Sequence, residues 1–322
     1  MNRLGSTEKS RSGFCRESHQ LRVAYVGPHF GEEPPLTGTQ GSGTVFFTGC
    51  SLRCSFCQNY QISRDGFGQE ITVQALVDQV ANMIRDHRVH NVNLVTPDHF
   101  LPHVAALVTG LREEGYDLPV VMNLSGYQSL TMLRMSEGIA DIYLPDFKYA
   151  DPHLSATLSK CRDYREVALQ AISEMVRQKG FLDSFEKGTT LATSGVLVRH
   201  LVLPGKVENS IHALTTLFLE FGPHLPLSLM SQYTTVMPNK DQDLNRPLRR
   251  EEFDTVYSHA ADLGFECLFV QFPDEGPTEK TPFLPDFSGT NLSHAKLQTV
   301  TVTGFSGLTP GWDLDKRQAS LW

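Results

Sequence analysis

Three absences narrow the class of protein to which this sequence belongs. No run of roughly 18 apolar residues occurs, so no helix is predicted to cross a membrane. Basic residues do not predominate: 28 Lys and Arg stand against 36 Asp and Glu, and a formal net charge of −8 argues against a nucleic-acid partner. The first 18 residues contain no apolar core, so no secretory signal is predicted and a reducing cytoplasm is the expected location.

The rest of the composition suffices for a large folded core. The chain has 322 residues, of which 40% are hydrophobic and 20% charged, and this balance excludes wholesale disorder. Strands are predicted at residues 44–49, 91–96, 120–125, 142–148, 196–203 and 227–233, with one more suggested at 266–271. Helices are predicted at residues 72–87, 101–114, 129–137, 166–178, 210–221 and 250–263. The alternation predicts an α/β fold, a partial (β/α)6-type parallel barrel with its chemistry at the carboxyl ends of the strands.

Both ends of the chain depart from this alternation. Residues 16–43 contain much Gly and Pro and are predicted to be irregular. Residues 276–322 are rich in Gly, Pro, Ser and Thr, with one edge strand suggested at 299–302. We therefore expect an irregular N-terminal segment at 1–40, a barrel at 41–273 and an irregular C-terminal extension at 274–322.

Three of the six cysteines fall within eight residues, directly after the first predicted strand. Cys50, Cys54 and Cys57 stand in CSLRCSFC, and thiolates at these short separations can hold one compact metal centre. A closed zinc site would need a fourth Cys or His nearby, and none follows before His87. Three thiolates without a fourth local ligand fit a four-iron cluster with one open iron. A zinc site and three buried thiols that pack as small hydrophobic side chains are the alternatives.

The motif CSLRCSFC resembles the cluster motif of the radical S-adenosylmethionine (SAM) superfamily, in which an aromatic residue usually precedes the last Cys, as Phe56 does here. This resemblance makes Phe56 a candidate cofactor-binding residue. The chain resembles more closely the PflX-type proteins, relatives of the pyruvate formate-lyase-activating enzymes. The stretches that carry this resemblance, within residues 22–288, are HFGEEPPLTGTQGSGTVFFTGCSLRCSFCQNYQIS, VTPDHFLP, LPDFKY, RHLVLPG, LMSQYT and FLPDF. The cluster motif is typical of the superfamily, whereas HFGEEPP and CQNYQIS are typical of the subfamily.

The resemblance implies an enzyme with a barrel of the radical SAM type and two cofactors, a [4Fe-4S] cluster and SAM. One electron from the reduced cluster would cleave SAM to methionine and a 5′-deoxyadenosyl radical, which takes a hydrogen atom from the substrate. The implied partners are a low-potential electron donor of the flavodoxin or ferredoxin type and, as one candidate substrate, a glycyl-radical enzyme. An iron–sulfur electron-transfer or assembly protein without SAM chemistry is the alternative function, and a fourth Cys ligand would favour it.

Polar side chains near the ends of three predicted strands are candidates for holding SAM, because residues i and i+2 of a strand face the same side. Asp146 and Lys148 form a D-x-K that the resemblance places near SAM; a structural ion pair is the alternative. Asn123 and Ser125 could hydrogen-bond the ribose or the methionyl carboxylate, or form an ordinary strand-end turn. Arg199 matches an Arg of the activating enzymes, and its guanidinium suits a carboxylate.

Other polar residues at the strand ends have less definite roles. His200 faces the opposite side from Arg199 and is expected to be structural. Residues 231–233 end the sixth strand and could face the substrate. Thr96 begins the sequence TPDH, where many radical SAM enzymes carry a Gly-rich motif with an acidic residue, so no side-chain role is transferred to this strand.

Two carboxylates and three cysteines complete the candidates. Glu32 and Glu33 belong to HFGEEPP but are assigned no chemistry, and exposed loop carboxylates are the simplest interpretation. Cys161 and Cys267 are expected to be buried or incidental thiols. Cys15 precedes the barrel and is not expected to ligate its cluster.

Overall fold

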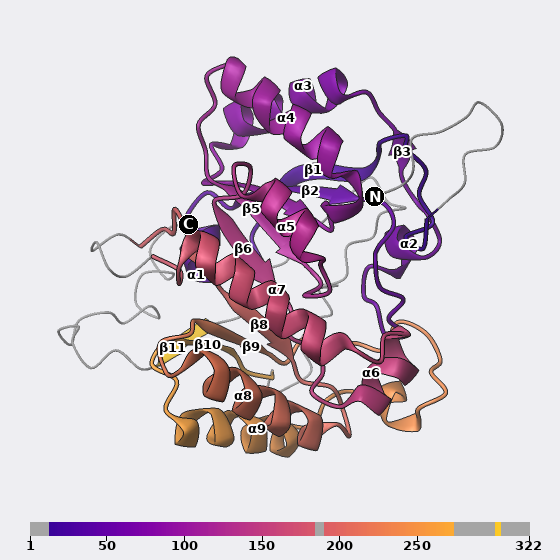
Figure 1. Cartoon of the computed structure of the whole chain (residues 1–322), viewed down its shortest axis with the longest axis vertical. Coiled ribbons are helices and arrows are strands. Elements are labelled where there is room, and N and C mark those ends of the chain that lie inside the picture. Colours follow the sequence, from indigo (N-terminus) through magenta and orange to yellow (C-terminus); the bar gives the residue numbers. More distant parts are fainter. Residues whose placement is uncertain (1–12, 184–189, 274–299, 304–322) are drawn as a thin grey trace, which may run out of the picture.

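A computed structural model describes residues 13–183, 190–273 and 300–303, and its centre is formed by parallel strands in two sheets (Figure 1). In the larger sheet the parallel strands are β2 (Ser42–Phe47), β4 (Val92–Val95), β5 (Val120–Leu124), β6 (Ile142–Pro145) and β7 (Gly195–Val196). In the smaller sheet they are β8 (Val198–Leu201), β9 (Leu227–Met230) and β10 (Leu268–Gln271). All the predicted strands are present, with ends that shift by up to three residues.

The two sheets meet between β6 and β8. Only Leu197 separates β7 from β8, and Asp146 at the end of β6 forms a parallel bridge with Arg199 of β8. Within the described residues, the outermost strands β3 and β11 belong to different sheets and do not pair with each other. The predicted α/β class with a parallel sheet is confirmed, and in the described part of the chain the barrel is open.

Helices connect successive parallel strands and cover the sheets from outside (Figure 1). They are α3 (Val73–His87), α4 (Leu101–Glu113), α5 (Leu130–Ser136), α7 (Tyr164–Lys179), α8 (Val207–Phe221) and α9 (Arg250–Leu263). The helix α3 illustrates why they form where the sequence predicts. Oγ1 of Thr72 accepts a hydrogen bond from the backbone N–H of Ala75 at 3.2 Å, and Leu76, Val80 and Ile84 at four-residue spacing are buried.

The expectation that residues 16–43 are irregular is wrong. They contain the strand β1 (Arg22–His29), which pairs antiparallel with β2, and the short helix α1 (Pro34–Thr37). The strand β3 (Gln69–Glu70) pairs with β1 only at Arg22 and Val23, so the rest of β1 lies at the edge of the sheet. An edge tolerates a proline, which explains how Pro28 stands in a strand although Gly and Pro suggested a loop.

Several shorter elements are also absent from the sequence prediction, namely α2 (Tyr60–Ser63), α6 (Pro152–Ser159) and the two 3-10 turns Asp98–Phe100 and Gln242–Asn245. The strand β11 (Val300–Thr303) pairs antiparallel with β10, which confirms the suggested edge strand. The remainder of the C-terminal extension, including the stretch FLPDF, lies outside the described residues. The boundaries at 40 and 273 stay predictions.

The interior of the open barrel has its own apolar cluster, which is separate from the core under the helices. Leu36 of α1 is fully buried there against residues near the beginnings of parallel strands, among them Val121, Ile142, Leu197 and Phe269. The segment before and within α1 therefore closes the barrel at the amino ends of its strands. This placement brings residues 32 and 33 into the interior.

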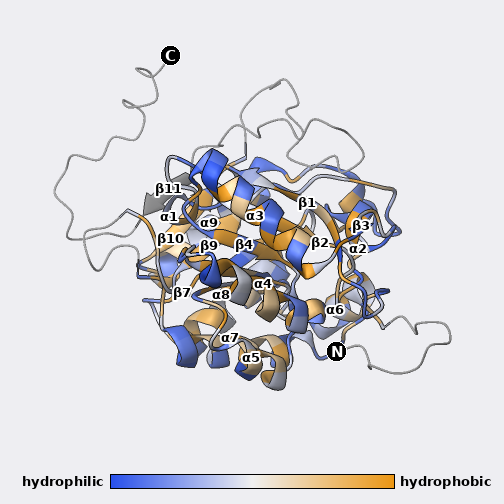
Figure 2. Cartoon of the chain, turned by 90° about the horizontal axis from the view of Figure 1, so that it is seen from above, coloured by the Kyte–Doolittle hydropathy of each residue, from blue (hydrophilic) through white to orange (hydrophobic). Residues whose placement is uncertain are grey.

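Hydrophobic residues concentrate on the central strands, whereas hydrophilic residues gather on the surrounding helices and loops (Figure 2). This is the distribution expected when helices cover a sheet with one apolar face each. No helix in the described ranges combines the length and the apolar character needed to cross a bilayer.

Candidate functional site

The three clustered cysteines lie on the loop that leaves the carboxyl end of β2 and leads to α2. Gly49 makes the turn into this loop with a φ of 78°, a region that favours glycine. A Cβ atom at this position would also lie 2.6 Å from Cγ of Glu17 and 2.7 Å from the carbonyl oxygen of Cys15. Glycine is therefore needed where the chain turns from the strand to the cysteines.

The three cysteines are half-buried and lie close enough to influence one another electrostatically. Burial raises the pKa of Cys50 well above its ordinary value, and the neighbouring Cys57 and Cys54 raise this pKa further. The Ser159 hydroxyl donates to Sγ of Cys54 at 2.9 Å, and Sγ of Cys57 lies 3.2 Å from Oγ of Ser63. The loop thus gathers the three sulfur atoms in one neighbourhood.

Lys148 reaches this neighbourhood from β6. Burial raises the pKa of Cys54 to about 11, although the positive charge of Lys148 opposes the shift. Burial by itself would lower the pKa of Lys148, but the carboxylate of Asp146, with the neighbouring Cys54, outweighs burial and raises this pKa above its ordinary value. Nζ of Lys148 forms an ion pair with the carboxylate of Asp146. The predicted D-x-K pair therefore exists, and its lysine stands beside the cysteine loop.

The donor set fits an iron–sulfur cluster, whose usual ligands are thiolates. Within the described ranges, no three His, Cys, Asp or Glu side chains converge as ligands of one metal ion would. Cys50, Cys54 and Cys57 supply the thiols, and the positive charge of Lys148 favours the thiolate form that binds iron. The zinc alternative gains no support from this arrangement.

Asn123 and Ser125 stand at the end of β5, next to the ion pair. The hydroxyl of Ser125 accepts a hydrogen bond from Nε2 of Gln128 at 3.1 Å, as expected for a strand-end turn. The Tyr164 hydroxyl lies 2.8 Å from the carbonyl oxygens of Ser125 and Asp146, which ties the two strand ends together. Asn123 is half-buried, and its side chain forms no hydrogen bond within the described residues. A role of Asn123 in holding SAM stays a prediction.

Phe56 of the cysteine loop packs into the protein interior. Its ring is buried, with centroids 6.4 Å from those of Tyr149 and Tyr233. The segment after β9 also covers the loop, since Nε2 of Gln58 donates to the carbonyl oxygen of Gln232 at 2.5 Å. Residues 231–233 are predicted as candidates to face the substrate. Gln232 and Tyr233 both contact the cysteine loop, and the Tyr233 hydroxyl also donates to the carbonyl oxygen of Leu244.

Arg199 has partners that the sequence does not reveal. Its Nε donates to Oε1 of Glu33 at 2.9 Å, and its Nη2 donates to the carboxylates of both Glu33 and Glu32. Glu32 is only 7% exposed and Glu33 only 6%, so the interpretation of this pair as exposed loop carboxylates is wrong. Because two carboxylates of the chain already engage this guanidinium, a SAM carboxylate would have to compete with them. The SAM contact of Arg199 stays a prediction.

Asp98 and His99 are functional candidates that sequence reasoning missed. Asp98 accepts a hydrogen bond from Oγ of Ser51 in the cysteine loop, and Nε2 of His99 lies 2.6 Å from the carbonyl oxygen of Thr48. Burial alone would raise the pKa of Asp98, but the hydrogen bonds and charge of its neighbours lower it, so this carboxylate is ionised. The preceding Thr96 has a φ of 52°, which is unusual for a β-branched residue. The acidic residue in the sequence TPDH is the feature that could have pointed to this candidate.

The remaining candidates behave as structural groups. Nδ1 of His200 donates to the carbonyl oxygen of Phe147 at 2.6 Å, and Nε2 lies 2.9 Å from Oγ of Ser210, which confirms a structural histidine. Cys161 is buried and Cys267 is half-buried, and both are free thiols. The expectation that Cys15 does not ligate the cluster stays a prediction.

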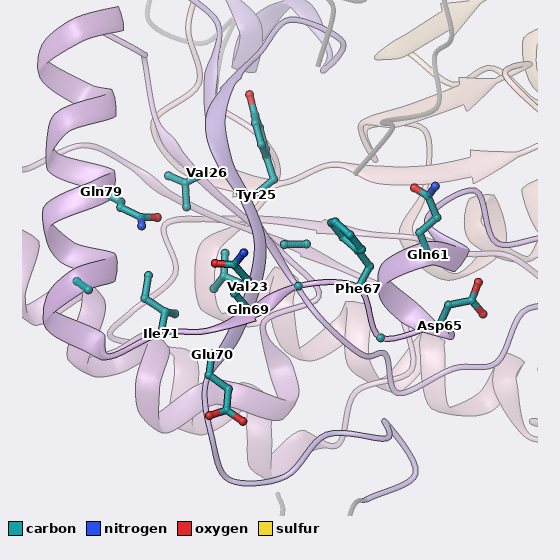
Figure 3. A pocket seen from close by; sticks show the side chains of 14 residues that line it. Val23, Tyr25, Val26, Gln61, Asp65, Phe67, Gln69, Glu70, Ile71 and Gln79 are labelled. Carbon is teal, nitrogen blue, oxygen red and sulfur yellow. The ribbon is translucent and has the colours of Figure 1, made fainter. Parts of the chain in front are cut away.

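A separate cavity of about 1130 Å³ lies between β1, the segment 65–71 and α3. Tyr25, Gln61 and Phe67 are among the side chains that line it (Figure 3). None of the SAM-site residues predicted from the sequence lines this cavity.

The family model of the Radical SAM superfamily matches residues 44–215, which are more than half of the chain. The chain therefore belongs to this superfamily. The superfamily uses a [4Fe-4S] cluster and SAM, and these are the cofactors of this protein. An uncharacterized protein of Methanocaldococcus jannaschii is 26% identical over 270 residues, which cover 81% of this chain and 73% of the relative. Membership of the PflX-type subfamily stays a prediction.

Three solved structures are among those with which the chain shares partial similarity. SuiB of Streptococcus suis bound to SAM is 13% identical, with a TM-score of 0.44 over 70% of this chain and 48% of that one. A spore photoproduct lyase variant is 11% identical, with a TM-score of 0.46 over 70% and 74%. A domain of pyruvate-formate lyase-activating enzyme from Bacteroides vulgatus is 13% identical, with a TM-score of 0.36 over 53% and 92%. The chain spans about half of the length of SuiB.

Proposed function

We propose that this protein holds its [4Fe-4S] cluster on Cys50, Cys54 and Cys57, cleaves SAM reductively and abstracts a hydrogen atom from a substrate. One observation carries the proposal: the three half-buried thiols lie close together after the carboxyl end of β2, with the cation of Lys148 beside Cys54. When bound, the cluster and SAM together supply the electron transfer that yields a 5′-deoxyadenosyl radical.

The chain's own residues would position SAM around the open iron. Lys148 supplies positive charge, and its ion pair with Asp146 fixes the direction of the ammonium group. The unpartnered amide of Asn123 lies on the neighbouring strand, where it could hydrogen-bond the ribose. The segment after β9 covers the cysteine loop through Gln232 and so limits the access of water.

The finer proposal is that the substrate is a glycyl-radical enzyme and that a flavodoxin or ferredoxin type protein supplies the electron. Its support is the resemblance of HFGEEPP and CQNYQIS to the relatives of the activating enzymes. Radical SAM enzymes in general need a reductant, so the requirement for an electron donor follows from the superfamily. Oxidoreductase activity of the activating-enzyme kind follows only if this substrate is correct.

Anaerobic reconstitution tests the proposal. The reconstituted protein should contain about four irons and four sulfides per chain and, with a chemical reductant, release 5′-deoxyadenosine from SAM. A protein with a full cluster that never cleaves SAM would favour the electron-transfer or assembly alternative. For the finer proposal, mixing with a glycyl-radical enzyme from the same genome should produce a backbone radical signal in electron paramagnetic resonance. Cleavage without that signal for any such enzyme would contradict it.

A further inference from the structure

Four polar side chains meet inside the barrel, below the level of the cysteine loop. Glu32 and Glu33 come from the segment between β1 and α1, Asn93 from β4 and Arg199 from β8. Arg199 lies two residues after Leu197, which packs in the interior apolar cluster, so both side chains face the interior. The Asp146–Lys148 ion pair is a neighbour of this group, because Asp146 bridges to Arg199, and its own two charges compensate each other.

The charges in this group do not balance. The two carboxylates of Glu32 and Glu33 share one guanidinium, which leaves one surplus negative charge. All three side chains are more than nine-tenths buried, where an uncompensated charge is costly. His29 is the other titratable group that acts on Glu32, but within the described residues its ring forms no ion pair with either carboxylate, whereas Arg199 pairs with both.

The hydrogen bonds do not balance either. Nδ2 of Asn93 donates to Oε1 of Glu32 at 2.9 Å, which fixes the orientation of the amide. Oδ1 of the same amide is fully buried and has no donor within the described residues. A buried carbonyl oxygen without a donor is unfavourable. The group therefore lacks one positive charge and one N–H donor at the same place.

We infer that Glu32, Glu33 and Asn93 form a binding subsite for the ammonium or amidinium group of the substrate. One N–H-bearing cation supplies both the missing charge and the missing donor. The sulfonium of SAM is also a cation but has no N–H for Asn93, so a nitrogen cation fits better. An anionic ligand would meet surplus negative charge here. The inference rests on the proposed function and adds the substrate class, an amine or amidine.

Binding of n-butylammonium, compared with neutral 1-butanol, tests the subsite in the reconstituted protein by isothermal titration calorimetry. The decisive variant is Glu32→Gln, which removes the surplus charge but leaves the Glu33–Arg199 fork in place. We expect n-butylammonium to bind the parent protein at least tenfold more tightly than the variant, and 1-butanol to bind neither. Glu174→Gln is the matched control, since Glu174 is also buried and pairs with an arginine, but on the outer helix α7. It should leave the affinity unchanged.

Equal affinity of n-butylammonium for the parent protein and Glu32→Gln would overturn the inference. A second arm compares SAM with neutral S-adenosylhomocysteine, and we expect Glu32→Gln to leave the ratio of these affinities unchanged. A tenfold fall in that ratio without a loss of n-butylammonium binding would assign the subsite to SAM and overturn the substrate assignment. Failure of the proposed function would appear separately, as a protein that binds n-butylammonium but releases no 5′-deoxyadenosine.

Discussion

The guanidinium of Arg199 and the carboxylate of Glu33 form a buried fork, with Nε of the arginine 2.9 Å from Oε1 of the glutamate. The two residues are 166 positions apart in the chain. Their contact links the segment before α1 to β8 and gives a physical reason for the acidic pair in HFGEEPP. It also changes what the removal of Arg199 should do.

Arg199→Ala should destabilise the fold, because it leaves two buried carboxylates without their cation. Breaking a buried ion pair in this way costs about 3–5 kcal/mol. Arg199→Lys should recover little of that loss, since one ammonium group cannot reproduce the fork. The measurement is urea unfolding of the iron-free protein in reductant.

Arg250→Ala serves as a control for the loss of an arginine, since Arg250 pairs with Asp254 on the exposed face of α9. It should cost less than about 1 kcal/mol. Unchanged stability of Arg199→Ala together with a tenfold loss of SAM affinity would return Arg199 to the role of a SAM contact.

The cluster should depend on three cysteines and no others. Cys50→Ala, Cys54→Ala and Cys57→Ala should each abolish the four-iron cluster, because each removes one of its three thiolate ligands. Cys161→Ala and Cys267→Ala should retain it. Iron and sulfide analysis of the reconstituted proteins decides the matter, and full content in Cys54→Ala would refute the ligand assignment.

Lys148→Ala should weaken SAM binding without altering cluster content. A desolvated charge-assisted contact contributes about 1.5–3 kcal/mol, which corresponds to roughly tenfold to hundredfold in affinity. Titration of the reconstituted cluster with SAM measures the effect, and Lys179→Ala on the outer helix α7 is the control. Full SAM affinity in Lys148→Ala, with lower stability in Asp146→Ala, would instead support a structural ion pair.

Periodicity predicted the parallel strands and their connecting helices because long apolar patterns determine which face is buried. The segment around β1 escaped prediction because Gly27 and Pro28 suggest a loop when neighbours in space are unknown. The pairing of β1 with β2 makes it a strand. Edge position is a property of the whole sheet, and local sequence does not encode it.

The same limit applies to the site. Short spacing was enough to group Cys50, Cys54 and Cys57, and strand parity was enough to pair Asp146 with Lys148. The partners of Arg199 could not be predicted in this way, because Glu32 and Glu33 come from a segment that folds into the barrel from outside the strand pattern. Contacts between distant segments depend on how the loop packs, and neither parity nor spacing describes that.

His200 should make the fold less stable as the pH falls. Burial lowers its pKa to about 4 in the folded protein, whereas an unfolded histidine has a pKa of about 6.5. Below pH 6.5 the unfolded chain therefore binds a proton that the folded chain does not, so the stability from this group is lost as the pH falls from about 6.5 to 4. The loss reaches about 3 kcal/mol, at about 1.4 kcal/mol per pH unit.

Urea unfolding of the iron-free protein between pH 4.5 and 7.5 should show this slope, and His200→Gln should lack most of it. His224→Gln, which removes an exposed histidine, should keep the parent slope. Identical slopes in the parent protein and His200→Gln would show that His200 does not contribute.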